Sequence, residues 1–226
     1  MNIKVCGITQ VKQVQQLEGL EIDFVGFIFD KNSPRNVEGK LEAKEIANAD
    51  YDLKKVGVFV NPSYSDILDA IENYGLDVVQ LHGEESPEFC SDLNEDVEVI
   101  KVFHIDESVT NVDELVAPYD MACDYYLFDT SPPTPLQTER GEKAVLRGGT
   151  GKQFDWSILA KSKIEKPFFL SGGIGVEDIA KIKAFKHPDF YGVDINSKFE
   201  TEPGIKDMGK ILQFKAGMKP PSPKGG

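Results

Sequence analysis

Two side chains that could move protons each stand at the end of a short apolar run: the thiol of Cys6 and the carboxyl group of Asp129. A thiolate can accept a proton and a carboxylic acid can donate one, so the two at one rim would suit isomerisation by proton transfer. Each also has a simpler interpretation. A lone strand cysteine can be a small buried hydrophobic side chain, and Asp129 can cap the loop that Thr130 begins.

Glycine and small polar residues late in the chain suit the binding of an anion. Gly172 and Gly173 follow one apolar run, and Asn196 and Ser197 follow the next. Glycine lets backbone N–H groups turn towards an anion without interference from a Cβ atom, and serine adds a hydroxyl group. The two segments therefore predict a phosphate-binding cradle.

Several polar and charged side chains are expected to share the inward parity of the thiol and the carboxyl group, because side chains alternate along a strand. They are Lys4, Gln80, His82, Lys101 and Asp194. A buried charge needs a partner, so a structural network that pairs Lys4 or Lys101 with Asp194 competes with a role in the site. His82 either lines the pocket or is a satisfied structural histidine.

Short runs of β-branched and aromatic residues alternate with helix-like segments from end to end, which is typical of βα units around a parallel sheet. The expected strands are 3–8, 24–29, 55–60, 78–82, 99–105, 125–129, 167–171 and 191–196. Apolar residues at three- and four-residue spacing mark the helices, for example Ile67, Leu68 and Ile71. Eight such units predict an α/β fold, a single (β/α)₈ TIM barrel.

The barrel prediction explains why these residues would meet. Active sites of such barrels lie at the carboxyl ends of the strands, where Cys6 and Asp129 both fall. The loops after the seventh and eighth strands form the recurrent phosphate site, and the glycine and serine segments stand there. The proton-transfer pair and the cradle are therefore expected at one rim.

Composition fits one globular domain. The chain has 226 residues, 40% hydrophobic and 28% charged, and we expect a barrel over 1–218 and a disordered, proline- and glycine-rich tail over 219–226. A formal charge of −13 disfavours nucleic acid and anionic membrane surfaces as partners. Three cysteines without CxxC spacing argue against a disulfide framework and a zinc site. The lack of a leader-like or membrane-spanning apolar run predicts a cytoplasmic protein.

One connection is longer than the others. Residues 130–147, which include three prolines, separate the sixth expected strand from the glycine-rich segment 148–151. Loops of this length are often functional, so this one is either a lid over the site or an excursion across the surface. The segment 148–151 lacks the Gly-Lys-Ser/Thr ending of a P-loop and is not a Gly-x-Gly-x-x-Gly motif, which excludes a nucleotide site there.

The chain resembles the phosphoribosylanthranilate isomerase family of tryptophan biosynthesis from residue 1 to about residue 209. The segments that carry the resemblance are 4–9, 29–35, 58–61, 80–84, 128–130, 148–151, 154–156, 171–174 and 192–197. The resemblance implies a phosphate-binding barrel that converts N-(5-phosphoribosyl)anthranilate to 1-(2-carboxyphenylamino)-1-deoxyribulose 5-phosphate. This Amadori rearrangement needs neither metal nor cofactor.

The resemblance also implies catalytic roles. Asp129 is the general acid that protonates the furanose ring oxygen, and Cys6 is the general base that removes the proton from sugar C2. The site must then lower the pKa of Cys6 and raise that of Asp129.

Binding roles follow from the same resemblance. Arg35 is the expected partner of the anthranilate carboxylate, since a guanidinium group offers bidentate geometry, although a surface arginine after Pro34 is the alternative. His82 and Asp194 are expected to line the substrate site. The phosphate-binding set is Gly149, Gly172, Gly173, Asn196 and Ser197. The expected partner is a small phosphorylated sugar–anthranilate, and the protein is expected to be a monomer or homodimer.

Two other interpretations compete. One is a related phosphate-binding barrel enzyme, of the indole-glycerol-phosphate synthase or tryptophan synthase α type, which shares the late loops but not the cysteine. The other is a barrel that binds a phosphorylated metabolite without catalysis. The chain also departs from the family at strand eight, where Lys198 replaces a glycine after Ser197. An inward-turned Lys198 would add a charge contact to the phosphate.

Overall fold

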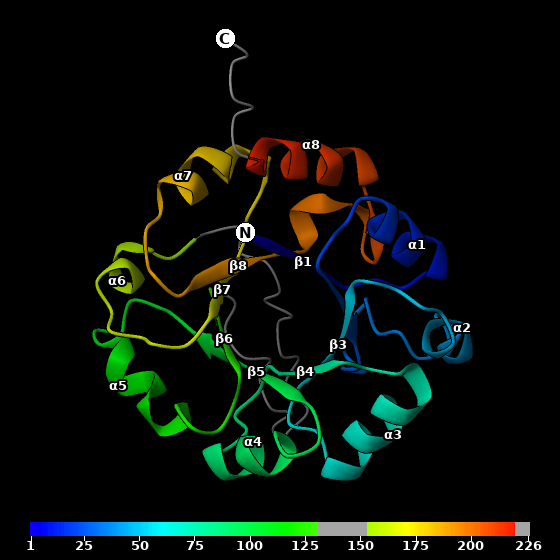
Figure 1. The fold of residues 1–226 in the computed structure, drawn as a ribbon, viewed down its shortest axis with the longest axis horizontal. Helices are drawn as coiled ribbons and strands as arrows, with labels where there is room; N and C mark the ends of the chain where they lie inside the picture. Colours follow the sequence, from blue (N-terminus) through cyan, green and yellow to red (C-terminus); the bar gives the residue numbers. More distant parts are fainter. Residues whose placement is uncertain (131–152, 220–226) are drawn as a thin grey trace, which may run out of the picture.

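The computed structural model describes residues 1–130 and 153–219. Eight parallel strands close into a barrel in chain order, and helices surround it as an outer ring (Figure 1). The strands are β1 (Asn2–Cys6), β2 (Phe24–Ile28), β3 (Lys54–Phe59), β4 (Val78–Leu81), β5 (Glu98–His104), β6 (Tyr125–Asp129), β7 (Phe168–Leu170) and β8 (Phe190–Ile195). The predicted (β/α)₈ barrel is confirmed, and each strand ends within two residues of its expected bounds.

The helices follow the strands as βα units require. They are α1 (Val11–Gly19), α2 (Ala43–Ala47), α3 (Tyr64–Tyr74), α4 (Pro87–Leu93), α5 (Val112–Val116), α6 (Ser157–Ala160), α7 (Ile179–Ala184) and α8 (Met208–Met218), with 3₁₀ turns η1 (Ala117–Tyr119), η2 (Val176–Asp178) and η3 (Ser197–Phe199). Local signals fix α3 well: Ser63 and Asp66 form a capping box, and Gly75 ends the helix at a φ of 60°. A small hairpin of β9 (Glu200–Glu202) and β10 (Ile205–Lys206) follows η3 and was not predicted.

The buried apolar side chains form two clusters, one inside the barrel and one between the barrel and the helices. The inner cluster is Phe24, Val56, Val78, Ile100, Val102, Leu127 and Phe169. On β1, Val5 belongs to the outer cluster. A Cβ atom on Gly26 would stand 2.8 Å from Cys6 Sγ and 3.2 Å from Lys4 Nζ, so these two side chains lie side by side inside the barrel. The predicted parity of β1 is therefore confirmed.

Lys101 does not face the barrel interior, contrary to the prediction. Its neighbours Ile100 and Val102 belong to the inner cluster, so alternation turns Lys101 towards the helices. Its ammonium group donates to the Gly83 carbonyl and to Glu85 Oε2, each at 2.7 Å. The prediction failed because both faces of β5 are apolar around this lysine, so polarity alone could not assign the parity.

Some predictions concern residues outside the described ranges. Gly149, most of the long connection 130–147 and nearly all of the tail 219–226 lie there. Within 1–130 and 153–219, the helices are all too short or too polar to cross a lipid bilayer.

Candidate active site

Cys6 is the last residue of β1, and its side chain is 4% exposed. The next residue, Gly7, has a φ of 77°, which favours glycine. A Cβ atom at this glycine would stand 2.7 Å from Arg35 Cδ and 2.9 Å from Asn196 Oδ1. Gly7 therefore lets two further side chains cross directly beside the thiol.

A buried ion pair lies next to the thiol inside the barrel. Lys4 Nζ donates to Asp194 Oδ1 at 3.0 Å, and both residues are buried. Burial lowers the pKa of Lys4, but the Asp194 carboxylate outweighs it, so the pKa is raised and the ammonium group stays charged. The predicted structural pairing of Lys4 with Asp194 is thus confirmed, while the alternative pairing through Lys101 is wrong.

Burial favours the neutral form of the thiol. Burial raises the pKa of Cys6 above its usual value, and the cationic groups of Lys4 and Lys206 only partly oppose this effect. The pKa of Cys6 is therefore raised by its surroundings, contrary to the expectation that the site lowers it. Desolvation of a thiolate costs more here than the two ammonium groups return.

Asp129 ends β6 on the opposite side of the rim and is also buried. His82 Nε2 lies 3.8 Å from its Oδ2 atom. Burial, followed by the charge of His104, lowers the pKa of His82 to about 3. His82 is therefore a neutral imidazole beside the carboxyl group, and it does not form a charged pair with it.

The imidazole of His82 is held in one tautomer. The Gln80 amide Nε2 lies 3.1 Å from His82 Nδ1, so Nδ1 accepts and the proton is on Nε2, which faces Asp129. The ring of His104 packs edge-on against that of His82, with centroids 5.1 Å apart. His104 was not predicted, although it has the parity of Val102, which faces the barrel interior.

A buried network behind the rim fixes the loop that carries His82. Glu85 accepts from Lys101 Nζ at 2.7 Å and from the backbone N–H of Gly83, and it also accepts from the N–H of Asn61 at 2.9 Å. Asn61 has a φ of 46°, and its side-chain oxygen accepts a hydrogen bond from the N–H of Glu84. The loops after β3 and β4 are therefore tied to β5, and Glu85 is a residue that sequence reasoning missed.

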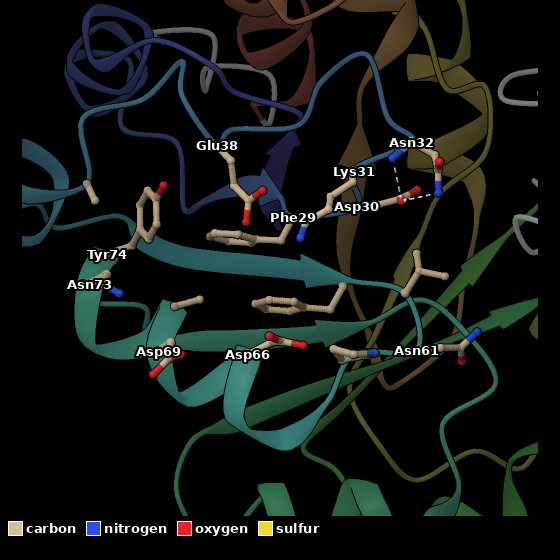
Figure 2. A pocket seen from close by; sticks show the side chains of 15 residues that line it. Phe29, Asp30, Lys31, Asn32, Glu38, Asn61, Asp66, Asp69, Asn73 and Tyr74 are labelled. Carbon is tan, nitrogen blue, oxygen red and sulfur yellow. Dashed lines mark hydrogen bonds between the residues drawn. The ribbon is translucent and has the colours of Figure 1, made fainter.

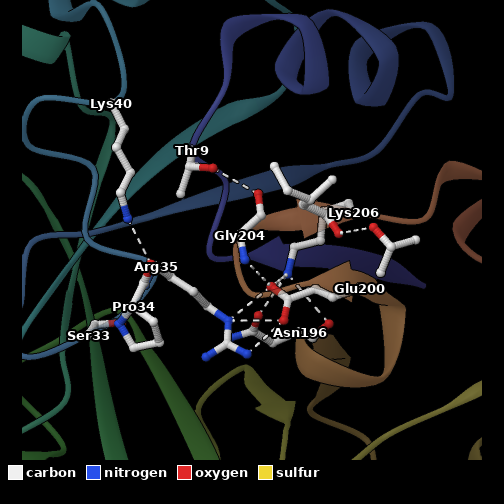
Figure 3. Close-up of polar contacts among 11 residues, drawn as sticks. Thr9, Ser33, Pro34, Arg35, Lys40, Asn196, Glu200, Gly204 and Lys206 are labelled. Carbon is white, nitrogen blue, oxygen red and sulfur yellow. Dashed lines mark hydrogen bonds and ion pairs between the residues drawn. The ribbon is translucent and has the colours of Figure 1, made fainter.

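Arg35 is partly buried next to Gly7 and is not a surface arginine. Its guanidinium group makes a bidentate contact with the Glu200 carboxylate, with Nη2 2.6 Å from Oε2 (Figure 3). Hydrogen bonding to Glu200 raises the pKa of Arg35, so the group is charged at any ordinary pH. The structure thus brings Arg35 beside Cys6, as Gly7 allows.

The predicted cradle begins directly after β7. Gly172 and Gly173 have φ values of 87° and 62°, so both need glycine. A Cβ atom on Gly172 would stand 2.2 Å from Thr130 Oγ1, which places this turn against the end of β6. The glycine pair therefore borders the same rim as Asp129.

The side chains that follow β8 point in two directions. Asn196 turns its side-chain oxygen to Lys206 Nζ, at 2.7 Å, so this side chain belongs to the β1 side of the rim. Ser197 is exposed and begins η3. Lys198 donates to Glu177, which lies in η2 shortly after the glycine pair. Its ammonium group is thus paired with the Glu177 carboxylate.

A separate pocket of about 600 Å³ lies on the flank of the barrel, between the loop after β2 and α3 (Figure 2). Its floor includes the stacked rings of Phe29 and Phe59, with centroids 4.8 Å apart. None of the predicted site residues lines it. Over the described ranges, no group of three or more His, Cys, Asp or Glu side chains is arranged to hold a metal ion.

A closed (β/α)₈ barrel with a thiol, a carboxyl group, an arginine and two positive-φ glycines at one rim is typical of barrel enzymes for small phosphorylated substrates. Comparison with known proteins narrows this class. Residues 3–216 match the family described as N-(5'phosphoribosyl)anthranilate (PRA) isomerase. The chain belongs to this family.

Individual relatives agree over nearly the whole chain. The chain is 42% identical over 217 residues to N-(5'-phosphoribosyl)anthranilate isomerase of Parabacteroides distasonis, covering 95% of this chain and 91% of that protein. It is 36% identical to the enzyme of Phocaeicola vulgatus, with 95% and 96% covered. The solved phosphoribosyl anthranilate isomerase of Thermotoga maritima superposes with a TM-score of 0.78 at 30% identity, covering 96% and 98%.

Proposed function

We propose that this protein isomerises N-(5-phosphoribosyl)anthranilate to 1-(2-carboxyphenylamino)-1-deoxyribulose 5-phosphate in tryptophan biosynthesis. Family membership supports the substrate. So does a solved family structure in complex with reduced 1-(o-carboxyphenylamino)-1-deoxyribulose 5-phosphate, 28% identical with a TM-score of 0.75. The single observation that carries the chemistry is that Cys6 and Asp129 end two different strands of one barrel rim.

Asp129 acts first, as general acid. It protonates the furanose ring oxygen, the bond between that oxygen and C1 breaks, and the nitrogen lone pair forms an iminium ion with C1. Asp194 lies near enough for its charge to interact with that of Asp129: burial raises the pKa of Asp194, Lys4 opposes this, and the charge of Asp129 raises it further. The N–H of His82 faces the carboxylate that Asp129 becomes.

Cys6 acts second, as general base. Its thiolate removes the proton from C2, and the C–H electron pair forms a double bond to C1 and neutralises the iminium nitrogen. The resulting enolamine tautomerises to the ketone. Although burial raises the pKa of Cys6, the iminium ion is a cation, and its formation favours the thiolate as Lys4 and Lys206 do.

The remaining residues bind the two ends of the substrate. Arg35 offers N–H donors to the anthranilate carboxylate, and Gly172 and Gly173 offer a backbone turn to the phosphate. The exposed hydroxyl of Ser197 is the next donor along the rim. His82 and Asp194 line the space between these ends, and Gly149 and Asn196 complete the proposed phosphate set.

The cellular setting and assembly follow the same proposal. We place the protein in the cytoplasm, where a pathway of small phosphorylated intermediates would operate, as a monomer or homodimer. The Thermotoga maritima isomerase is described as dimeric, and engineered monomers of it superpose on this chain with a TM-score of 0.76 at 29% identity.

Loss of substrate fluorescence tests the proposal. The wild-type protein is expected to consume N-(5-phosphoribosyl)anthranilate, whereas Cys6→Ser and Asp129→Asn are each expected to lose most of the turnover. A wild-type protein without turnover would overturn the proposed function. A variant that kept wild-type kcat would overturn only the role given to that residue.

A further inference from the structure

The guanidinium group of Arg35 is held by one edge only. Nε donates to both carboxylate oxygens of Glu200, at 2.9 and 3.1 Å, and Nη2 donates to Oε2 at 2.6 Å (Figure 3). A guanidinium group carries five N–H donors in a rigid plane. The Glu200 carboxylate therefore occupies the edge of the guanidinium group formed by Nε and Nη2. Nη1 has no hydrogen-bond acceptor within the described ranges.

Glu200 is itself fixed by two further donors. Its Oε1 atom accepts from Lys206 Nζ at 2.7 Å and from the backbone N–H of Gly204 at 3.0 Å. Its side chain is 5% exposed. Although burial raises the pKa of Glu200, hydrogen bonds and charge from Arg35 and Lys206 outweigh it and lower the pKa. Glu200 is therefore an ionised carboxylate whose orientation is fixed by Lys206 and the backbone of Gly204.

The hairpin that carries Glu200 is anchored to the barrel at several points. Phe199 is fully buried and packs edge-on against Phe214 of α8, with ring centroids 5.1 Å apart. The hydroxyl group of Thr9 donates to the Gly204 carbonyl at 2.8 Å. The carboxylate therefore belongs to a rigid element that is joined both to α8 and to the loop after β1.

Arg35 reaches this carboxylate by crossing the residue next to the thiol. Its Cδ atom lies 2.7 Å from where a Cβ atom on Gly7 would stand. Asn196 Oδ1 crosses at 2.9 Å from the same point and accepts from Lys206 Nζ. The guanidinium group is thus fixed beside Cys6, at the edge of the proposed substrate site.

We propose that Glu200 is a positioning residue that sets the direction of the Arg35 guanidinium group, so that its unfilled edge receives the carboxylate of the substrate's aromatic ring. This rests on the proposed function and extends it to specificity. Glu200 does not touch the substrate. An arginine that is already ordered loses little side-chain entropy on binding, so the site favours a ring with an ortho carboxylate over one without it.

Calorimetric binding of two ligands tests this role. One ligand is reduced 1-(o-carboxyphenylamino)-1-deoxyribulose 5-phosphate, and the other is its analogue with hydrogen in place of the carboxyl group. Glu200→Gln should weaken binding of the first about tenfold and of the second by less than about twofold, because an amide has one accepting oxygen in place of two and its NH₂ group would face a donor. The matched control Glu202→Gln removes the same charge from the exposed part of β9 and should change neither affinity.

Equal weakening of both ligands would overturn the inference, because Glu200 would then only shape the pocket, and so would unchanged binding of both. If Glu200→Gln does not fold, Glu200→Asp keeps the charge but withdraws the carboxylate, and the same selective loss is expected. In an Arg35→Ala background, Glu200→Gln should have no further effect on either ligand. Wild-type protein that binds neither ligand would instead overturn the proposed function.

Discussion

The two sides of the barrel rim carry different charges around their central groups. On the side of β1, Cys6 lies among the cationic groups of Lys4, Lys206 and Arg35. On the side of β4 to β6, the neutral imidazole of His82 lies 3.8 Å from Asp129 Oδ2. The thiol therefore has several cationic neighbours, whereas the carboxyl group has a neutral imidazole among its neighbours.

This difference in neighbouring charge matches the role proposed for each group, base for Cys6 and acid for Asp129. Cations beside a buried thiol favour its ionised form and reduce the desolvation cost. A neutral histidine beside a carboxyl group adds no positive charge that would hold it ionised, but can still donate a hydrogen bond once the proton has left. The comparison indicates that the base and the acid on one rim have neighbours of different charge.

Of the substitutions considered, replacing the thiol of Cys6 on the β1 side is expected to lower the activity most. We expect Cys6→Ser to lower kcat/KM by about 10³- to 10⁴-fold, because serine cannot supply a comparable base. Cys90→Ser is the matched control, since Cys90 is a buried thiol in α4. Steady-state turnover measures both. Comparable losses in the two variants would mean that the effect of Cys6→Ser is structural.

Substitutions of the two buried lysines should separate an effect on the free energy of unfolding from an effect on the pKa of Cys6. Lys4→Met and Lys101→Met each leave a buried carboxylate without its partner, and each should lower the free energy of unfolding by about 3–5 kcal/mol in urea titrations. Only Lys4→Met should also raise the pKa of Cys6, because the Lys4 charge lowers it. Alkylation of Cys6 against pH measures this pKa. An equal shift in both variants would contradict the particular effect of Lys4 on the thiol.

The β4 to β6 side should show its neutral histidine in the pH dependence of stability. With a folded pKa of about 3 and an unfolded value near 6.5, only the unfolded state takes up a proton at His82 as the pH falls below 6.5. Stability is therefore lost between about pH 6.5 and pH 3, and His82 accounts for about 2 kcal/mol of it at pH 5. His82→Asn should remove this part of the slope.

Denaturation of wild type and His82→Asn at pH 7 and pH 5 measures the effect. The difference at pH 7, where the histidine is neutral in both states, gives the packing cost of the substitution and is subtracted. An unchanged slope between the two pH values would show that His82 is protonated in the folded protein.

The smallest effect is expected at the phosphate end. The pair of Lys198 and Glu177 is solvent-accessible, with side chains 33% and 59% exposed, so it contributes little stability. Lys198→Ala should leave KM within about twofold of wild type, because the ammonium group is turned to Glu177. A tenfold rise in KM would show that Lys198 contacts the phosphate after all.

Strand periodicity predicted the barrel and the parity of β1, because eight short apolar runs leave few alternative folds. It failed at Lys101, where both strand faces are apolar. The contact of Arg35 with Glu200 spans 165 residues, and although Pro203-Gly204 marks the turn of the hairpin, no local signal reports which distant residue Glu200 meets. The raised pKa of Cys6 depends on burial in three dimensions, which residue spacing does not report.

The central claim is that Asp129 opens the ring and Cys6 then removes the proton from C2. Turnover of substrate deuterated at sugar C2 separates these steps. In Cys6→Ser, proton removal should limit the rate, so a large deuterium effect on kcat is expected. In Asp129→Asn, ring opening should limit the rate, so the effect should be close to unity. Equal isotope effects in the two variants would contradict the division of roles between the two sides of the rim.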